Sequence, residues 1–324
     1  MTQELAVEAT QLVKTFGDLR AVDGIDLRVR RGHVFGVLGP NGAGKTTMLK
    51  MLATLLPIDG GSARVFGVDV ATRPHEVRQL VGVTGQYASV DENLTGRENL
   101  VLFGRLLGQA RKHAVATADE LLASFGLAEA ADRRVKEFSG GMRRRLDLAS
   151  SLISRPPLIF LDEPTTGLDP RTRGQMWDTI RQLVRDGATV LLTTQYLDEA
   201  DQLADRIAVI DRGVKVAEGT PDELKAGVGN STLHVRLEDR AHTAEAAAIV
   251  ARVLGSDPVL TPEAGGLNIA LADANRAADV LIALRQAKIG IATATVRQPT
   301  LDEVFLALTG RSTEAQPDAL KEVA

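Results

Sequence analysis

The 324-residue sequence predicts an α/β fold with a mostly parallel sheet, followed by a small α+β domain. Short apolar segments such as Pro157–Leu161 and Thr189–Thr194 alternate with amphipathic helical segments, the pattern of a parallel sheet covered by helices. A glycine-rich loop at residues 39–46 follows the apolar run His33–Leu38 and precedes a helical pattern. Beyond residue 230 the chain shows a second, separate alternation of strands and helices.

Before the glycine-rich loop the sequence pattern predicts strands. Leu5–Phe16 alternates, Asp23-Gly24 predicts a turn, and Ile25–Arg30 alternates again. After the loop, helical spacing predicts a helix over Lys45–Leu56. Further amphipathic helices, expected between the early and late strands over Leu94–Leu107 and Lys112–Phe125, would form a helical subdomain.

The last third of the chain predicts a compact domain of its own. Its order βαββαβ is typical of a ferredoxin-like layer with an added helix, with elements expected at 233–237, 244–254, 258–260, 267–271, 274–287, 289–296 and 301–308. We assign residues 1–228 to the first domain and 229–310 to this second domain. Residues 311–324 are polar and are expected to form a flexible tail.

The amino-acid composition narrows the range of functions that the chain can have. The chain has no Cys, which excludes a disulfide framework or a thiolate metal site. Its formal net charge of −4 disfavours a role that consists mainly of binding nucleic acid. No run approaches the ~18 apolar residues of a membrane-spanning helix, so a membrane role would need a separate partner.

The glycine-rich loop matches G-x-x-x-x-G-K-[ST] in full, through Gly39, Pro40, Asn41, Gly42, Ala43, Gly44, Lys45 and Thr46. Its glycines let the backbone wrap a phosphate, and the N–H groups of the loop and the following helix favour negative charge. Lys45 would bring a cation to the β- and γ-phosphates, and Thr46 a hydroxyl to Mg²⁺. The flanking strand and helix disfavour an ordinary turn with an incidental lysine.

A pair of acids ends the apolar segment Leu158–Leu161. Because adjacent strand residues point to opposite faces, Asp162 and Glu163 are expected to have separate tasks. Asp162 would hold Mg²⁺, through water, and Glu163 would act as general base on the attacking water. Alone, the two acids could equally be solvated or cap a helix.

The segment Phe138–Leu146 resembles the signature segment of the ATP-binding cassette (ABC) ATPases. Gln86 resembles that family's glutamine loop, Thr166–Asp169 its aspartate loop, and Phe16 the aromatic residue stacked on adenine. The resemblance covers residues 1–225 and implies a P-loop ABC ATPase cassette with ATP and Mg²⁺ as ligands. It implies nucleotide contacts from Phe16, Gly39–Thr46, Thr47, Gln86, Ser139, Gly140, Gly141 and Asp169, and metal contacts from Thr46, Gln86 and Asp162.

The family resemblance also implies a head-to-tail homodimer in which Ser139–Gly141 of one subunit face the phosphate loop of the other. Ser139 can cap the following helix, so simple capping explains part of the same pattern. The run Arg143–Arg145 spreads around a helix, and we interpret it as a solvated face or a contact with the partner or nucleotide.

Two positions depart from the family pattern. Gln195 stands where a histidine is usual, and it can donate a hydrogen bond to the γ-phosphate but cannot carry charge. The expected catalytic set is therefore Glu163, Lys45 and Gln195. Met142 replaces the glutamine common in the signature.

The Gln195 segment, the C-terminal unit and the ending Leu301–Gly310 resemble the daunorubicin/doxorubicin-resistance type of ATP-binding protein. This resemblance implies efflux of a hydrophobic drug through a separate integral membrane subunit, with the protein peripheral at the cytoplasmic face of the membrane. Lipid or oligosaccharide export is an alternative, as is a purely regulatory subunit. A soluble ABC ATPase acting on ribosomes or DNA is disfavoured, because such chains usually carry two cassettes. In the last helix Leu301, Val304, Phe305 and Leu308 share one face, for packing on its own domain or for a dimer contact.

Overall fold

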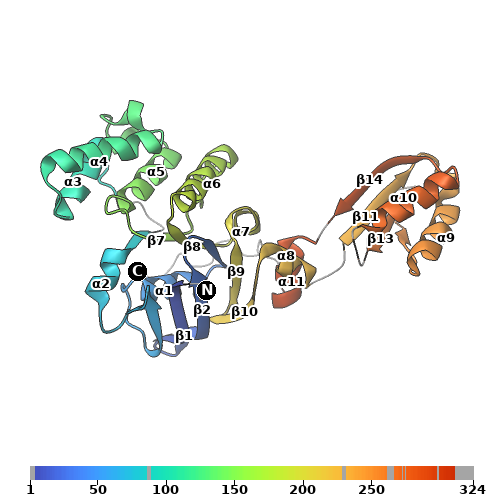
Figure 1. Ribbon diagram of the computed structural model, residues 1–324, viewed down its shortest axis with the longest axis horizontal. Coiled ribbons are helices and arrows are strands. Elements are labelled where there is room, and N and C mark those ends of the chain that lie inside the picture. The colour runs from blue at the N-terminus through green and yellow to red at the C-terminus, as the bar shows by residue number, and fades with distance from the viewer. Residues whose placement is uncertain are drawn as a thin grey trace. The chain divides into compact units, whose positions relative to one another are not determined.

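The computed structural model describes residues 4–85, 89–227, 231–260, 266–271, 273, 275–297 and 299–310 (Figure 1). These residues form two compact units that divide between Pro221 and Asp222. The boundary expected between residues 228 and 229 stays a prediction, and the expected flexible tail, residues 311–324, lies outside the described residues.

A six-stranded sheet is the frame of the first unit. Its order is β10-β9-β3-β8-β7-β6, and all neighbours are parallel except β10 and β9. The strands are β3 (Val34–Leu38), β6 (Val81–Thr84), β7 (Leu158–Asp162), β8 (Thr189–Thr194), β9 (Arg206–Asp211) and β10 (Val214–Gly219). The central strands β3, β7 and β8 are buried along their whole length, as continuous apolar runs require in a sheet covered on both faces.

A second, antiparallel sheet has the order β2-β1-β4-β5, with β1 (Leu5–Phe16), β2 (Leu19–Arg30), β4 (Gly60–Val65) and β5 (Val68–Asp69). The turn expected at Asp23-Gly24 is wrong, because β2 runs through both residues and Phe16 pairs with Leu19 across the actual turn. Gly24 has φ +72° and Gln11 on β1 has φ +49°. The ladder shifts register on both sides of Leu12, so the glycine belongs to an irregular stretch of a continuous hairpin.

Helices cover both faces of the parallel sheet and form a separate lobe of α3, α4 and α5 (Figure 1). They are α1 (Lys45–Leu52), α2 (Pro74–Leu80), α3 (Gly96–Leu106), α4 (Arg111–Ser124), α5 (Gly140–Ser151), α6 (Pro170–Arg185) and α7 (Leu197–Leu203). Helix α1 is shorter than the predicted Lys45–Leu56, since Thr54 adopts φ +61° and ends it. The predicted helical subdomain is present at α3 and α4.

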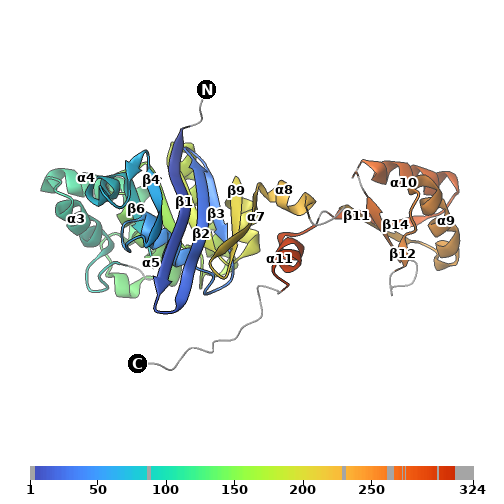
Figure 2. The same ribbon diagram turned by 90° about the horizontal axis from the view of Figure 1, so that it is seen from below.

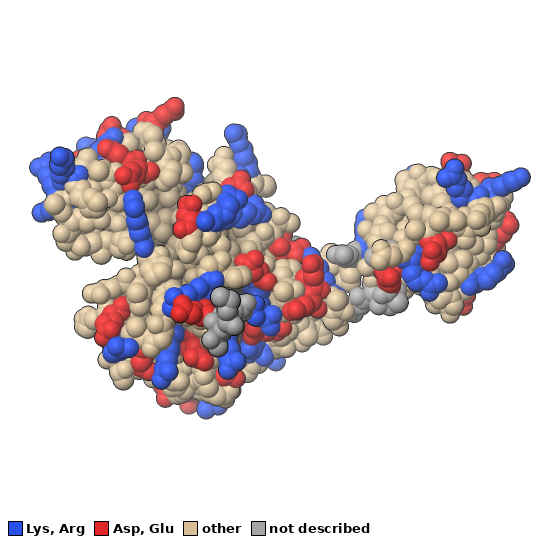
Figure 3. Space-filling view, viewed as in Figure 1, with Lys and Arg blue, Asp and Glu red and all other residues tan. Residues whose placement is uncertain are grey.

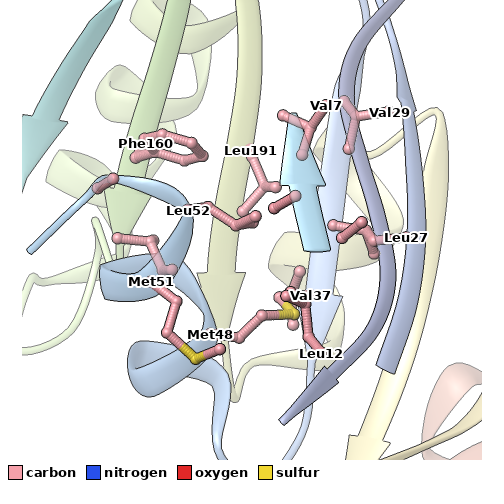
Figure 4. Packing of buried hydrophobic residues seen from close by; sticks show 14 of the residues in the cluster. Val7, Leu12, Leu27, Val29, Val37, Met48, Met51, Leu52, Phe160 and Leu191 are labelled. Atoms are coloured by element: carbon pink, nitrogen blue, oxygen red, sulfur yellow. The ribbon is translucent and has the colours of Figure 1, made fainter. Parts of the chain in front are cut away.

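Two apolar cores lie against opposite faces of the parallel sheet. The first core joins α1 to both sheets. Figure 4 shows the α1 side chains Met48, Met51 and Leu52 packed with side chains of the two sheets, namely Val7, Leu27 and Val29 of the antiparallel sheet and Phe160 and Leu191 of the parallel sheet. The second core joins the other face to α5, α6 and the helical lobe. The strand ends that carry the predicted motifs are therefore held between two packed layers.

The second unit contains β11 (Ser231–Leu237), α9 (Thr243–Leu254), β12 (Val259–Leu260), β13 (Gly266–Leu271), α10 (Arg276–Gln286) and β14 (Ile291–Arg297). Its antiparallel sheet has the order β12-β13-β11-β14, and both helices lie on one face of it (Figures 1 and 2). This is the predicted ferredoxin-like arrangement, with a core of its own.

Helix α8 (Pro221–Ala226) begins this region and α11 (Leu301–Thr309) ends it. On α11, Leu301, Val304 and Phe305 are buried, whereas Leu308 is 40% exposed. Most of the apolar face is thus covered within a single chain. Among the helices of the described residues, none combines the length and the apolar character needed to cross a membrane.

Candidate nucleotide-binding site

The phosphate loop begins where β3 ends, at the carboxyl edge of the parallel sheet. Gly39 N donates to the carbonyl of Thr194 at 3.2 Å, which ties the loop to the end of β8. Gly44 has φ +100°, and a Cβ there would lie 2.2 Å from the carbonyl oxygen of Ala21. Glycine is therefore required here by the approach of β2 as well as by the shape of the loop.

Lys45 lies inside the loop with only 4% of its surface exposed. Its Nζ donates to the carbonyl oxygens of Gly39 at 2.8 Å and Pro40 at 3.0 Å, and lies 3.4 Å from Glu163 Oε1. Burial lowers the pKa of Lys45, and the nearby carboxylates of Glu163 and Asp162 oppose this shift. The ammonium group is thus held at the loop by carbonyls and one carboxylate.

Two hydroxyl groups converge on Asp162. Thr46 Oγ1 donates to Asp162 Oδ1 at 2.9 Å, and Thr193 Oγ1 donates to the same oxygen at 2.6 Å. A carboxylate beside a threonine hydroxyl at the mouth of a phosphate loop suits Mg²⁺, which takes few protein oxygens and completes its shell with phosphate and water. The donor set of Thr46 and Asp162 therefore fits that ion.

Glu163 is buried directly after β7 and has φ +48°, a rare conformation for a residue with a side chain. Its N–H donates to both the carbonyl and the hydroxyl of Thr193, each at 3.1 Å, and its Oε2 accepts from Thr166 Oγ1 at 3.2 Å. The expectation of opposite faces is wrong, because the strand geometry ends at Asp162 and the chain turns. Both carboxylates reach the phosphate loop, with different partners there.

The signature segment packs against the first turn of α6, which follows the aspartate loop. Ser139 caps α5 by accepting from Met142 N at 3.3 Å, and Asp169 caps α6 by accepting from Thr172 N at 3.0 Å. A Cβ on Gly141 would lie 2.2 Å from Thr172 Cγ2, so α5 and α6 pack closely there. Within the described residues, Ser139 and Gly141 have no hydrogen bond to the phosphate loop of their own chain.

The remaining predicted residues lie at the rim. Phe16 is 46% exposed at the end of β1, with Lys14 Nζ 5.5 Å from its ring centroid. Gln195 is half-buried and follows β8, next to the Thr194 carbonyl that accepts from the loop. Thr47 is half-buried on α1, and Gln86 lies outside the described residues.

Two kinds of residue near the site were not predicted from the sequence. Thr193 supports both acids from β8, and only the pairing of β7 with β8 brings it there. The prediction that the run Arg143–Arg145 forms a solvated face is wrong for Arg144, which is buried. Arg143 is half-exposed and pairs with Glu92. Asp147, one turn after Arg144, was the available signal, because charges spaced i,i+3 can pair on a helix.

The first unit is similar to solved ATP-binding cassettes. Over 68% of this chain and 92% of the other, it matches the crystal structure of the ADP conformation of an ATP-binding cassette of an ABC transporter, with a TM-score of 0.62 and 26% identity. Residues 22–166 match the family model described as ABC transporter. Fold and site together define an ABC-type ATPase.

The second unit and the whole chain narrow the family. Residues 219–309 match the model of the DrrA1-3-like ATP-binding protein C-terminal domain. The chain is 54% identical to the daunorubicin/doxorubicin resistance ATP-binding protein of Streptomyces peucetius over 95% of both chains. It is 45% identical to a Nod factor export ATP-binding protein of Burkholderia lata over 67% of this chain and 72% of that protein. The chain belongs to the family of daunorubicin/doxorubicin-resistance ATP-binding proteins, within the ABC ATPases.

Proposed function

We propose that the chain forms a homodimer that hydrolyses Mg²⁺-ATP and thereby drives efflux of a hydrophobic drug or antibiotic through a separate membrane subunit. The observation that carries the ATPase half is the cluster at the phosphate loop, where Lys45, Thr46, Asp162 and Glu163 lie in hydrogen-bonding or ion-pairing contact. These groups supply, respectively, a cation, two oxygen ligands and a base.

In this proposal the loop and the start of α1 wrap the ATP phosphates, and Lys45 neutralises charge on the β- and γ-phosphates. Thr46 and Asp162 would hold Mg²⁺, which supplies electrostatic stabilisation to the transferring phosphoryl group. Glu163 takes a proton from the attacking water, and Gln195 donates a hydrogen bond to the γ-phosphate. With no histidine at that position, Glu163 is the one base in the scheme.

A second copy completes the site. ABC ATP-binding subunits dimerise and work with a separate membrane subunit. Ser139 caps α5, and a Cβ on Gly140 would meet nothing within 4 Å, so the start of α5 is open to an incoming phosphate group. We assign this end of α5 to the γ-phosphate bound by the partner subunit. We further propose nucleotide contacts from Phe16, Gln86 and Asp169, and a metal contact from Gln86. The subunit would sit at the cytoplasmic face of the membrane, held there by its partner.

The nature of the cargo rests on the relatives. Similarity to the daunorubicin/doxorubicin resistance protein extends over the second unit, whereas the Nod factor export protein matches only about two thirds of this chain. This difference favours drug efflux. The Nod factor relative keeps oligosaccharide or lipid export as a second candidate.

The decisive experiment uses inverted membrane vesicles that hold this chain and the membrane protein encoded beside it. We expect ATP-dependent uptake of an anthracycline, and no uptake with Glu163→Gln or without the membrane protein. Uptake of a lipid-linked sugar but not of the drug would favour the second candidate. Failure of all cargoes, with intact ATP turnover, would overturn the transport assignment.

A role on ribosomes or DNA would show itself differently. On the face seen in Figure 3, acidic and basic side chains are interspersed, which suits a protein without a nucleic-acid partner. ATP turnover of the purified protein should not respond to added RNA or DNA. Strong stimulation would move the assignment to that class, and absence of any Mg²⁺-dependent phosphate release would indicate a regulatory subunit.

A further inference from the structure

Helix α5 buries an ion pair that the proposed function does not use. Arg144 is 9% exposed and Asp147 2% exposed, and Arg144 Nη1 lies 3.7 Å from Asp147 Oδ2. Burying two charges costs much of what their attraction returns, unless further hydrogen bonds satisfy the groups. The partners of those further hydrogen bonds therefore indicate which segments the ion pair holds in place.

Arg144 reaches two separate segments. Its Nη2 donates to the carbonyls of Asp162 at 2.9 Å and Glu163 at 3.1 Å, and its Nε donates to that of Pro164 at 3.0 Å. Its Nη1 donates to the carbonyl of Gly85 at 2.5 Å. One guanidinium group thus joins the turn that carries both acids to the residue just after β6.

Asp147 reaches the other side of the same segment. Its Oδ1 accepts from the backbone N–H of Ser89 at 2.7 Å. Gly85 and Ser89 bracket residues 86–88, which include the expected glutamine loop. The ion pair on α5 therefore holds Gly85 and Ser89, one through each charged partner.

We propose that Arg144 and Asp147 are positioning residues that hold Gly85 and Ser89, the Glu163 turn and helix α5 together. A shift of Gly85 or Ser89 would then be passed through these bonds to α5 and to the turn that carries Glu163. The inference deepens the proposed function, since it rests on Glu163 as the base.

The chemistry of the guanidinium supports this role. Arg presents five N–H donors in a planar fork, and within the described part of the chain four different carbonyls accept from Arg144. The bonds grip the chain on both sides of Glu163, whose φ of +48° needs surrounding contacts to persist. A lysine ammonium has three donors and no such fork, so Arg144→Lys should not replace it.

The first test compares Arg144→Lys and Arg144→Met with the control Arg155→Met. Arg155 lies on the surface shortly after α5, and its Nη2 donates to Glu120 Oε2 in the helical lobe. For both Arg144 variants we expect kcat for ATP to fall by about tenfold or more while KM and the Kd for ATP stay within about twofold. Arg155→Met should leave kcat within about twofold, whatever its effect on the melting temperature.

Hydrogen exchange separates a positioning role from a merely structural one. In the Arg144 variants, amides in peptides covering 82–92 and 160–166 should exchange faster, while those in the second unit stay unchanged. An Arg144→Met protein that keeps its kcat, or that keeps full protection in both peptides, would overturn the proposal.

The second test uses variants of Asp147, and it tests the same positioning role if Arg144→Met fails to fold. Asp147→Asn keeps an oxygen that can accept from Ser89, and Asp147→Ala does not. Asn should therefore retain most of kcat and most of the protection at 82–92, whereas Ala should lose both. Equal behaviour of the two variants would refute the loop-holding role. A wild-type protein without ATP turnover would instead overturn the proposed function. Hydrogen exchange in the Arg144 and Asp147 variants would still test whether these residues hold the two segments in place.

Discussion

At the scale of single residues, the site depends on charges that are buried and yet paired. Lys45 and Glu163 lie 3.4 Å apart with little exposure, and each has further hydrogen-bond partners. Burial makes each charge costly alone, so the pair and its carbonyl and hydroxyl neighbours are mutually dependent. Substitution of either residue therefore tests function more cleanly when folding is measured alongside.

Removing the lysine cation should abolish turnover. For Lys45→Ala we expect phosphate release to fall by about 10²-fold or more, because the developing charge on the phosphates loses its cation. Lys50→Ala, an exposed position on the same helix, is the matched control and should keep normal turnover. Substantial release from Lys45→Ala would refute the phosphate-loop assignment.

Removing the base should separate binding from hydrolysis. Glu163→Gln keeps the shape of the side chain, so it should bind ATP normally, stop hydrolysis and accumulate as an ATP-bound dimer on size-exclusion chromatography. A near-normal hydrolysis rate would show that Glu163 is not the base.

A buried acid outside the phosphate loop predicts a pH effect on stability. Glu199 is fully buried and accepts from Thr165 Oγ1 at 2.8 Å and Trp177 Nε1 at 3.3 Å. Burial raises the pKa of Glu199 above its ordinary value of 4.5. Between the two values the folded state binds more protons than the unfolded state, so stability falls as pH rises.

Glu199→Gln should remove that fall, because the amide keeps an acceptor oxygen and cannot ionise. The check is the free energy of unfolding in denaturant, measured for both proteins from pH 4.5 upward. Parallel pH profiles for wild type and variant would contradict the expected contribution of Glu199.

At the scale of elements, the strand–loop–helix unit of β3 and α1 is shaped by what approaches it. A Cβ on Gly44 would lie 2.2 Å from the carbonyl oxygen of Ala21, whereas Gly42 has φ +79° with open space around its Cβ position. The two glycines share an unusual φ and differ in their surroundings. They therefore separate backbone strain from steric exclusion.

Gly44→Ala should destabilise the nucleotide-free protein by about 1–3 kcal/mol more than Gly42→Ala, because only the first adds a clash to the strain of a positive φ. Thermal unfolding without nucleotide measures the difference. Equal destabilisation would mean that β2 can move away from the loop at little cost.

At the scale of the whole molecule, the described residues form two units with separate apolar cores. The nucleotide site and its supports belong to the first unit. The second unit has its own closed core of β11, β13, α9 and α10, so the two should respond separately to perturbation.

Calorimetry should accordingly resolve two transitions. ATP at about 100 times its Kd should stabilise the first unit by ~2.7 kcal/mol and leave the second unchanged. Leu267→Ala, in the core of the second unit, should lower the free energy of unfolding of that unit by about 2–5 kcal/mol and leave ATP turnover intact. A single transition shifted by both treatments would contradict independent units.

Much of this protein follows from sequence alone, because its motifs are local. The loop around Lys45, the acid-ended strand before Glu163 and the capped start of α5 each depend on neighbours a few residues away, so spacing and residue type were enough to predict them. The alternation of apolar strands and helices likewise predicted both the parallel sheet and the ferredoxin-like layer.

The tertiary structure decided which distant groups those motifs meet. Thr193 reaches Asp162 across 31 positions, Arg144 turns inward to the carbonyl of Asp162 at the end of β7, and β2 continues past Asp23 because β1 pairs with it. Local propensity is silent on such partners, since they depend on how sheets and helices pack. Sequence by itself therefore determined the chemistry available at the site, and packing between distant segments determined how that chemistry is held together.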